Sequence, residues 1–199
     1  MRKILFLSFT CLLGACATLK TSPEYIARGN GYLTDGKVEQ AIASFNKALT
    51  LNPQNMQGYQ ARATAYFVKG DYAQAAQDFT TAINANPNNS NLYTGYASSV
   101  AAMGEYDKAL EALALAQQVN PEKPEIYLSR GNVYYMQGKY ELAVQDFTAL
   151  LAVYPAAEIF NMRGAALLKL DRPDLAKADF MAARSGQYPD TLEEYATAQ

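Results

Sequence analysis

Apolar side chains recur along this chain with the spacing of helices that bury one face. From residue 22 onward, stretches of about 13 residues with apolar positions three and four apart alternate with short turns. Four of the turns begin with a glycine, which can adopt the left-handed conformation that ends a helix, at Gly36, Gly70, Gly104 and Gly138. The pattern predicts an all-α protein of paired helices, each about 20 Å long. Because one such helix cannot bury its apolar face alone, the pairs must stack on one another.

The same side chains return every 34 residues. An aromatic residue marks each unit, at Tyr25, Tyr59, Tyr93, Tyr127 and, after 33 residues, Phe160. A small residue follows four positions later, at Gly29, Ala63, Ala97, Gly131 and Gly164. A larger apolar residue lies in the second half of each unit, at Phe45, Phe79, Leu113, Phe147 and Phe180. This self-similarity predicts five repeats, over residues 22–55, 56–89, 90–123, 124–156 and 157–189.

The series resembles the signature of the tetratricopeptide repeat family, which is an aromatic residue, a small residue four later, a further aromatic, then Ala, Phe and Pro. The resemblance covers residues 22–189 and implies a solenoid, a right-handed superhelix of helix–turn–helix repeats. The fifth unit departs from the pattern, since Asp171, Arg172 and Pro173 replace the glycine turn. Asp190 followed by Glu193 is a capping-box spacing that predicts a short C-terminal cap helix within residues 190–199.

The family resemblance also implies where a partner binds, because the first helix of each unit lines a concave groove in this family. One row of matching positions carries short polar side chains, at Asn30, Thr64, Ser98, Asn132 and Ala165. Two further rows are more apolar, namely Leu33, Phe67, Ala101, Tyr135 and Leu168, and Thr34, Val68, Ala102, Met136 and Lys169. Such a surface suits an extended peptide or an amphipathic helix. The small residues around Ala101 either leave a pocket for one apolar partner side chain or only adjust the superhelix curvature.

An arginine and an aspartate recur sixteen residues apart in three units, as Arg62 and Asp78, Arg130 and Asp146, and Arg163 and Asp179. The third unit lacks both residues, and the first keeps Arg28 but has a serine at the matching position. Because three of the four arginines are matched by an aspartate, and the unit without the arginine also lacks the aspartate, the spacing predicts structural ion pairs, within a unit or between neighbouring units. A site for an anionic ligand is the alternative.

Composition excludes several functions. The chain has no histidine and no cysteine after residue 16, which removes the commonest general base and the usual metal ligands. Its formal charge of −2 offers no basic stripe for nucleic acid. We therefore expect a protein that is not an enzyme and that uses no cofactor and no metal.

The first sixteen residues have the features of a secretory signal peptide. Arg2 and Lys3 precede an apolar core over residues 4–13 that is half as long as a membrane-spanning helix. The core ends in the sequence Leu-Gly-Ala-Cys at positions 13–16, which resembles the lipobox of bacterial lipoproteins. This resemblance implies a signal peptide over residues 1–15, a diacylglycerol group on Cys16 and a short tether over residues 16–22. Cleavage elsewhere in an ordinary signal peptide is the alternative.

Together these features predict a membrane-anchored scaffold or assembly factor for a bacterial envelope complex, with a protein or peptide partner in its groove. Ala17 after the lipidated residue, where retention at the inner membrane requires Asp in enterobacteria, favours the outer membrane facing the periplasm. The chain resembles small tetratricopeptide lipoproteins, including pilotin-like proteins that assist assembly of type IV pilus secretins. An adaptor for peptidoglycan synthases or hydrolases is the second hypothesis.

Overall fold

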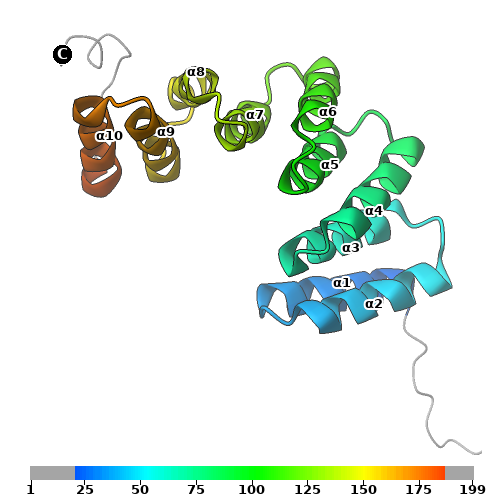
Figure 1. Ribbon diagram of the computed structural model, residues 1–199. Helices are drawn as coiled ribbons and strands as arrows, with labels where there is room; N and C mark the ends of the chain where they lie inside the picture. Colours follow the sequence, from blue (N-terminus) through cyan, green and yellow to red (C-terminus); the bar gives the residue numbers. More distant parts are fainter. Residues whose placement is uncertain (1–20, 187–199) are drawn as a thin grey trace, which may run out of the picture.

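The computed structural model describes residues 21–186, which form ten α-helices and no strand (Figure 1). The first helices of the five pairs are α1 (Ser22–Thr34), α3 (Met56–Lys69), α5 (Ser90–Ala102), α7 (Pro124–Met136) and α9 (Ala157–Lys169). The second helices are α2 (Val38–Leu51), α4 (Tyr72–Ala85), α6 (Tyr106–Val119), α8 (Tyr140–Leu151) and α10 (Pro173–Ser185). The predicted all-α fold is confirmed. Cys16, the rest of the predicted signal peptide and the predicted cap helix lie outside the described residues.

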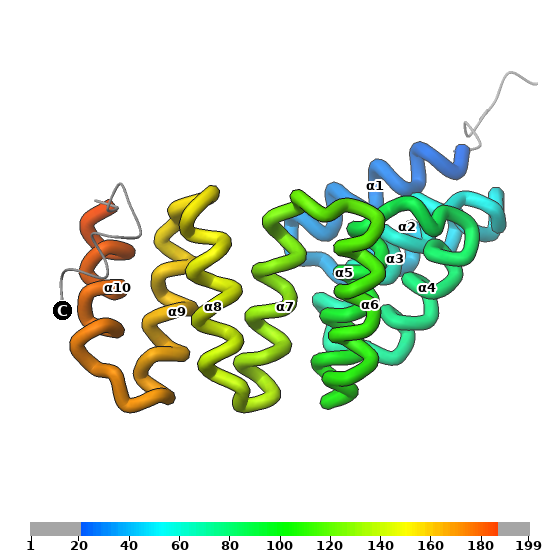
Figure 2. The backbone as a smooth tube through the Cα atoms, turned by 90° about the horizontal axis from the view of Figure 1, so that it is seen from above, coloured from blue at the N-terminus to red at the C-terminus, as the bar shows by residue number. Residues whose placement is uncertain are grey.

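The helix pairs stack into a curved solenoid. Each helix packs on its partner, and each second helix also packs on the first helix of the next pair. The contacts α1–α3, α3–α5 and α5–α7 join first helices, whereas no second helices in residues 21–186 pack together to a comparable extent. First helices thus follow the shorter, inner path of the arc, as Figure 1 shows for α1, α3, α5 and α7. Figure 2 shows that the helix axes turn along the stack, from α1 and α2 to α9 and α10.

The turns inside the pairs use one backbone geometry. In the second pair, Gly70 has a φ of 90°, and the amide of Asp71 donates to the carbonyl of Tyr66 at 2.9 Å. This six-to-one bond is the Schellman motif, which satisfies carbonyls left open at a helix end. The fifth turn keeps the motif although Asp171 replaces glycine, with a φ of 57°. Aspartate tolerates this left-handed region better than most residues with a side chain.

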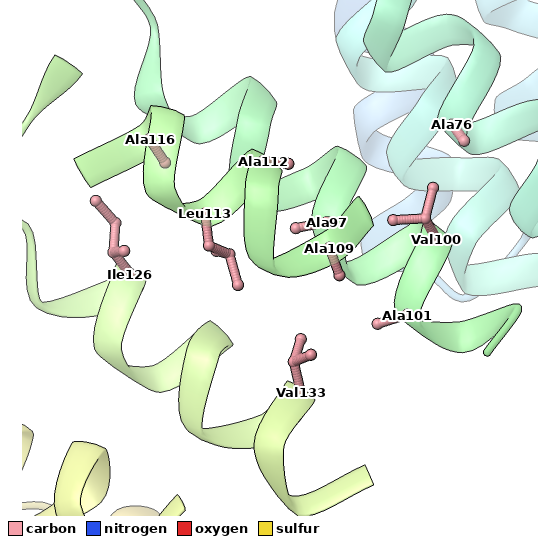
Figure 3. Packing of buried hydrophobic residues seen from close by; sticks show 10 residues of the cluster. All are labelled: Ala76, Ala97, Val100, Ala101, Ala109, Ala112, Leu113, Ala116, Ile126 and Val133. Atoms are coloured by element: carbon pink, nitrogen blue, oxygen red, sulfur yellow. The ribbon is translucent and has the colours of Figure 1, made fainter. Parts of the chain in front are cut away.

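The first four units each bury a large apolar side chain at one repeat position. The ring of Phe147 in α8 lies over Gly131 in α7, where an added Cβ atom would come within 2.7 Å of the ring. Phe45 lies over Gly29 in the same way. The third unit has Leu113 at this position, in a core of mainly small side chains. Figure 3 shows this core reaching from Ala76 in α4, through α5 and α6, to Val133 in α7. This core therefore joins the second, third and fourth units.

No helix within residues 21–186 is long and apolar enough to span a membrane.

Candidate partner-binding surface

The recurring arginines and aspartates form bidentate ion pairs between the two helices of one unit. Arg62 in α3 donates from Nε and Nη2 to the two carboxylate oxygens of Asp78 in α4, at 2.7 and 2.8 Å. Arg130 and Asp146 join α7 to α8 at 2.8 and 2.7 Å. The fifth unit repeats the geometry at 2.9 and 2.7 Å, between Arg163 and Asp179. Of the two arrangements left open by the sequence, the structure has the one within a unit.

Each of these arginines also donates a third hydrogen bond to the preceding unit. The Nη1 atoms of Arg62, Arg130 and Arg163 donate to Asn46, Gln117 and Thr148, at 2.7, 3.1 and 3.1 Å. Sequence reasoning missed these acceptors, because their residue types differ and they do not all share one repeat position. One signal was available in the sequence. A guanidinium that binds a carboxylate through two N–H groups still has further N–H donors, which need acceptors.

Aromatic rings also contact the three paired arginines. The guanidinium groups lie 5.5, 5.3 and 5.6 Å from the ring centroids of Tyr59, Tyr127 and Phe160, within cation–π range. The hydrogen bonds that Arg62 and Arg130 donate to Asp78 and Asp146 raise the pKa values of the two guanidinium groups above their ordinary value, against the opposing effect of burial. These pairs therefore join helices and units, and their hydrogen-bonding groups face the protein. The arrangement favours the structural role over an anionic-ligand site.

Most predicted groove residues are accessible on the inner helices. Asn30, Thr64 and Met136 are exposed, and a second group is half-buried, namely Leu33, Phe67, Ser98, Asn132 and Tyr135. Ala101 is different, since only 2% of it is exposed and it belongs to the core in Figure 3. The expectation that Ala101 lies on the groove surface is therefore corrected. Its methyl group faces the packed interior of the third unit and offers no pocket to a partner.

In the row of short polar side chains, from Asn30 to Ala165, some hydrogen-bonding groups are already used within the helices. The hydroxyl of Thr64 donates to the carbonyl of Gln60 at 3.1 Å, and that of Ser98 donates to Thr94 at 3.0 Å. Hydroxyl side chains in helices commonly bond to the carbonyl four residues earlier, which uses their only donor. Among residues 21–186, the side-chain amides of Asn30 and Asn132 donate no such bond. These two amides are the polar groups of the row that remain ready for a partner backbone.

Apolar side chains on the first helices stay exposed. Val68 and Met136 occupy the same repeat position in α3 and α7 and are 60% and 48% exposed, and Leu168 in α9 is 51% exposed. Sequence reasoning listed these residues among others without separating them, because periodicity alone does not give the exposed fraction. Their accessible surface makes them the strongest apolar contacts that the inner helices offer.

Two aromatic pairs border this surface. The rings of Phe67 and Tyr72 lie 5.4 Å apart, as do those of Tyr135 and Tyr140 two units later. In each pair an aromatic residue near the end of a first helix packs on the opening residue of a second helix. Tyr72 and Tyr140 were missed as supporting residues, although their spacing of two repeats was visible in the sequence. The pairs hold the rings of Phe67 and Tyr135 against the second helices.

No group of three potential metal-ligating side chains gathers within the part of the chain that the structure describes.

Comparisons with known proteins agree with the geometry. Models described as tetratricopeptide repeat match residues 26–90, 67–132 and 124–156, together about two thirds of the chain. A thermophilic tetratricopeptide repeat protein of Thermus thermophilus is 25% identical, with a TM-score of 0.74 over 89% of this chain and 98% of that one. A tetratricopeptide repeat protein of Parabacteroides merdae is 24% identical, with a TM-score of 0.74 over 89% of this chain and 69% of that one. PilF of Pseudomonas aeruginosa is 22% identical, with a TM-score of 0.71 over 84% of this chain and 77% of that one. No curated protein sequence matches the chain.

Proposed function

The chain belongs to the tetratricopeptide repeat family, and we propose on that basis that it is a protein–protein interaction scaffold held at the bacterial cell envelope. The observation that carries the proposal is the exposed apolar set on the inner helices, Val68, Met136 and Leu168. These side chains come from three units but share one side of the arc, so one partner segment can contact several of them. Burying such side chains supplies binding free energy of about 25 cal/mol for each Å² removed from water.

The chemistry of the surface selects the kind of partner. Half-buried Phe67 and Tyr135 give rigid apolar contact area, while the amides of Asn30 and Asn132 can bond a peptide backbone. Arg62, Arg130 and Arg163 are already engaged with Asp78, Asp146 and Asp179 and are not available to an acidic partner. The partner segment is thus an extended peptide or an amphipathic helix with apolar side chains at intervals. A preformed, stacked surface binds it with little reorganisation.

The scaffold is anchored through Cys16 in this proposal. The support is the order of charge, apolar core and lipobox in the first sixteen residues, which is typical of bacterial lipoproteins. Only residues 17–21 separate Cys16 from Ser22, the first residue of α1, a distance of about 20 Å when fully extended. The solenoid is then confined near a membrane, and its partners act there. Ala17 favours the outer membrane, facing the periplasm.

Replacing Cys16 with serine is expected to move the protein from the membrane fraction to the soluble periplasmic fraction. The serine variant cannot carry the thioether-linked diacylglycerol, so it loses the anchor and the mass of the lipid. Fractionation with mass spectrometry of the mature protein measures both changes, and Cys11→Ser is the matched control, because Cys11 lies in the segment that is removed. An unsubstituted mature protein that lacks the mass of the lipid contradicts the lipid anchor.

Two envelope roles fit a scaffold of this kind. One is assistance in assembling a type IV pilus secretin, and the other is an adaptor for peptidoglycan synthases or hydrolases. The position of the gene, among pilus genes or among cell-wall genes, distinguishes the two roles.

Charged substitutions on the inner surface are expected to abolish partner capture. With Val68 and Met136 both changed to glutamate, two carboxylates would have to lose water on binding, so the recovered partner is expected to fall at least tenfold, equivalent to about 1.4 kcal/mol. The assay is quantitative mass spectrometry after capture from envelope extracts by the full-length lipidated protein. Leu51→Glu on α2 is the matched control, since Leu51 is 54% exposed on a second helix. Equal recovery by the inner and control variants contradicts binding at the inner surface.

A further inference from the structure

The solenoid has two different edges. Inside each pair the chain turns at one end of the helices, so the connections to the next pair lie at the other end. Within residues 21–186 these connections are residues 52–55, 86–89, 120–123 and 152–156. Figure 2 shows the connections α6–α7 and α8–α9 on the upper side of the view, and the turns α7–α8 and α9–α10 on the lower side. The two sides are called the connection edge and the turn edge below.

The two edges differ in charge. Of the connections in the described part of the chain, only the one with Glu122 and Lys123 carries charged residues. In contrast, every turn inside a pair over the same range carries at least one, such as Asp71 or Lys139. A charged group loses more hydration free energy than an amide or an apolar group when it approaches an apolar phase. The connection edge is therefore the one that can approach such a phase at the lower cost.

The connection after α8 adds two exposed apolar side chains to this edge. Tyr154 has the repeat position that Asn52, Asn86 and Asn120 fill in the other connections. It is 59% exposed, and Val153 before it is 69% exposed, the highest value for a large apolar residue within residues 21–186. Because asparagine serves at this position in three other connections, the fold itself does not require an exposed aromatic side chain here.

The backbone amides of this connection are already paired. The amides of Val153 and Tyr154 donate to the carbonyl of Leu150 at 3.1 and 2.8 Å, and the amide of Ala152 donates to Thr148 at 3.1 Å. Pro155 has no amide hydrogen. An unpaired amide would lose free energy on leaving water for a lipid environment, and these four residues avoid that loss.

The start of α1 lies on the same side as the connections. Helix α1 begins at Ser22, and a first helix begins at the end of its pair opposite to the turn. Figure 2 shows the start of α1 on the upper side of the view, with the connections α6–α7 and α8–α9. In the proposed function, on which this step depends, Cys16 carries the lipid and only residues 17–21 join it to Ser22. A link of about 20 Å brings the connection edge, rather than the turn edge, toward the bilayer.

We propose that the connection edge rests on the lipid bilayer, with Val153 and Tyr154 inserted among the lipid headgroups. Tyrosine suits this depth because its ring is apolar while its hydroxyl group stays in contact with water. The exposed Glu125 and Glu158 lie in the first turns of α7 and α9, next to the connections, so the surface that fits is one of zwitterionic lipids. In this orientation the turn edge points away from the membrane, and the inner helices stay open to a partner from the side.

The test uses tryptophan fluorescence, because the chain has no tryptophan of its own. The mature chain, which starts at Cys16, is coupled through this single thiol to phosphatidylcholine vesicles that contain a maleimide lipid. Since interfacial side chains lie ~5–10 Å deep, brominated acyl chains are expected to quench about half of the emission of Tyr154→Trp. Met103→Trp is the matched control, because Met103 is 39% exposed at the turn edge, and its emission is expected to stay unchanged. Adding Val153→Asp to Tyr154→Trp is expected to remove the quenching, with the helix content by circular dichroism unchanged.

Equal emission of Tyr154→Trp in brominated and ordinary vesicles overturns the proposal, as does equal quenching of Tyr154→Trp and Met103→Trp. Light scattering in the absence of vesicles examines the other occupant: a dimer that Val153→Asp dissociates shows that a second copy covers the edge, and this also overturns the proposal. Because the maleimide lipid supplies the anchor, the result does not depend on lipidation of Cys16 in the cell. The mass of the mature protein tests that lipidation separately, so the two failures are distinguishable.

Discussion

Replacing Asp179 with alanine is expected to lower the free energy of unfolding by about 3–5 kcal/mol. The side chains of Asp179 and Arg163 are only 1% and 6% exposed, so the variant removes both carboxylate oxygens from a guanidinium that water cannot reach. The hydrogen bond from Arg163 to Thr148 remains but does not neutralise the charge. Because units of a solenoid interact mainly with their neighbours, the loss is expected to appear first as local unfolding of the last unit. Hydrogen exchange of α9 and α10, with denaturant unfolding, measures it.

Asp174→Ala is the matched control for this substitution. Asp174 lies on the same helix but is exposed, so its loss is expected to cost less than about 1 kcal/mol. Changing Arg163 to methionine together with Asp179 to leucine is expected to restore most of the stability, because no charge is then left buried. If Asp179→Ala is no more destabilising than Asp174→Ala, the buried pair is not a principal support of the last unit.

The third unit already shows that the repeat folds without the ion pair. It has Tyr96 and Ala112 where other units have arginine and aspartate, and both residues pack into its apolar core. This natural replacement of both partners at once agrees with the expectation that removing both charges is tolerated while removing one is not. The first unit has a third arrangement, since its unmatched Arg28 is exposed and donates to the hydroxyl of Tyr32 at 2.9 Å.

The parts of the molecule that follow local rules could be predicted from the sequence. Gly70 and its equivalents mark the turns because few other residues adopt a positive φ, which the structure shows at each of them. The spacing of sixteen between Arg163 and Asp179 also indicated their proximity, since helices joined by a fixed turn bring the same positions together in every unit. Repetition made both signals readable without any comparison of sequences.

The parts that depend on stacking between units could not be predicted in the same way. Ala101 has the periodicity of a groove residue, but its small size lets neighbouring helices approach and bury it. Thr148 as the acceptor of Arg163 depends on how far one unit is rotated on the next, and no residue spacing encodes that rotation. Sequence periodicity defines the faces of single helices, whereas exposure also requires the superhelix geometry.

Replacing Phe147 with alanine is expected to destabilise the protein by about 3–5 kcal/mol. Phe147 is 1% exposed and lies over Gly131, so the shortened side chain leaves a cavity that neither the glycine nor the stacked helices can fill. The ring also belongs to a core with Ile159 and Phe160 of the next unit. Its loss therefore weakens packing within the fourth unit and between the fourth and fifth units, which denaturant unfolding followed by circular dichroism measures.

The chain itself supplies the control for this prediction. Leu113 fills the same position in the third unit and is fully buried, so Phe147→Leu is expected to cost only about 1–2 kcal/mol. Leucine retains the apolar contact to the next unit and loses only part of the volume over Gly131. A difference of about 2 kcal/mol between the two variants shows that filling the space between units stabilises the stack. Equal stabilities mean instead that the neighbouring helices collapse around the smaller side chain, and that the solenoid adjusts its curvature to fill the cavity.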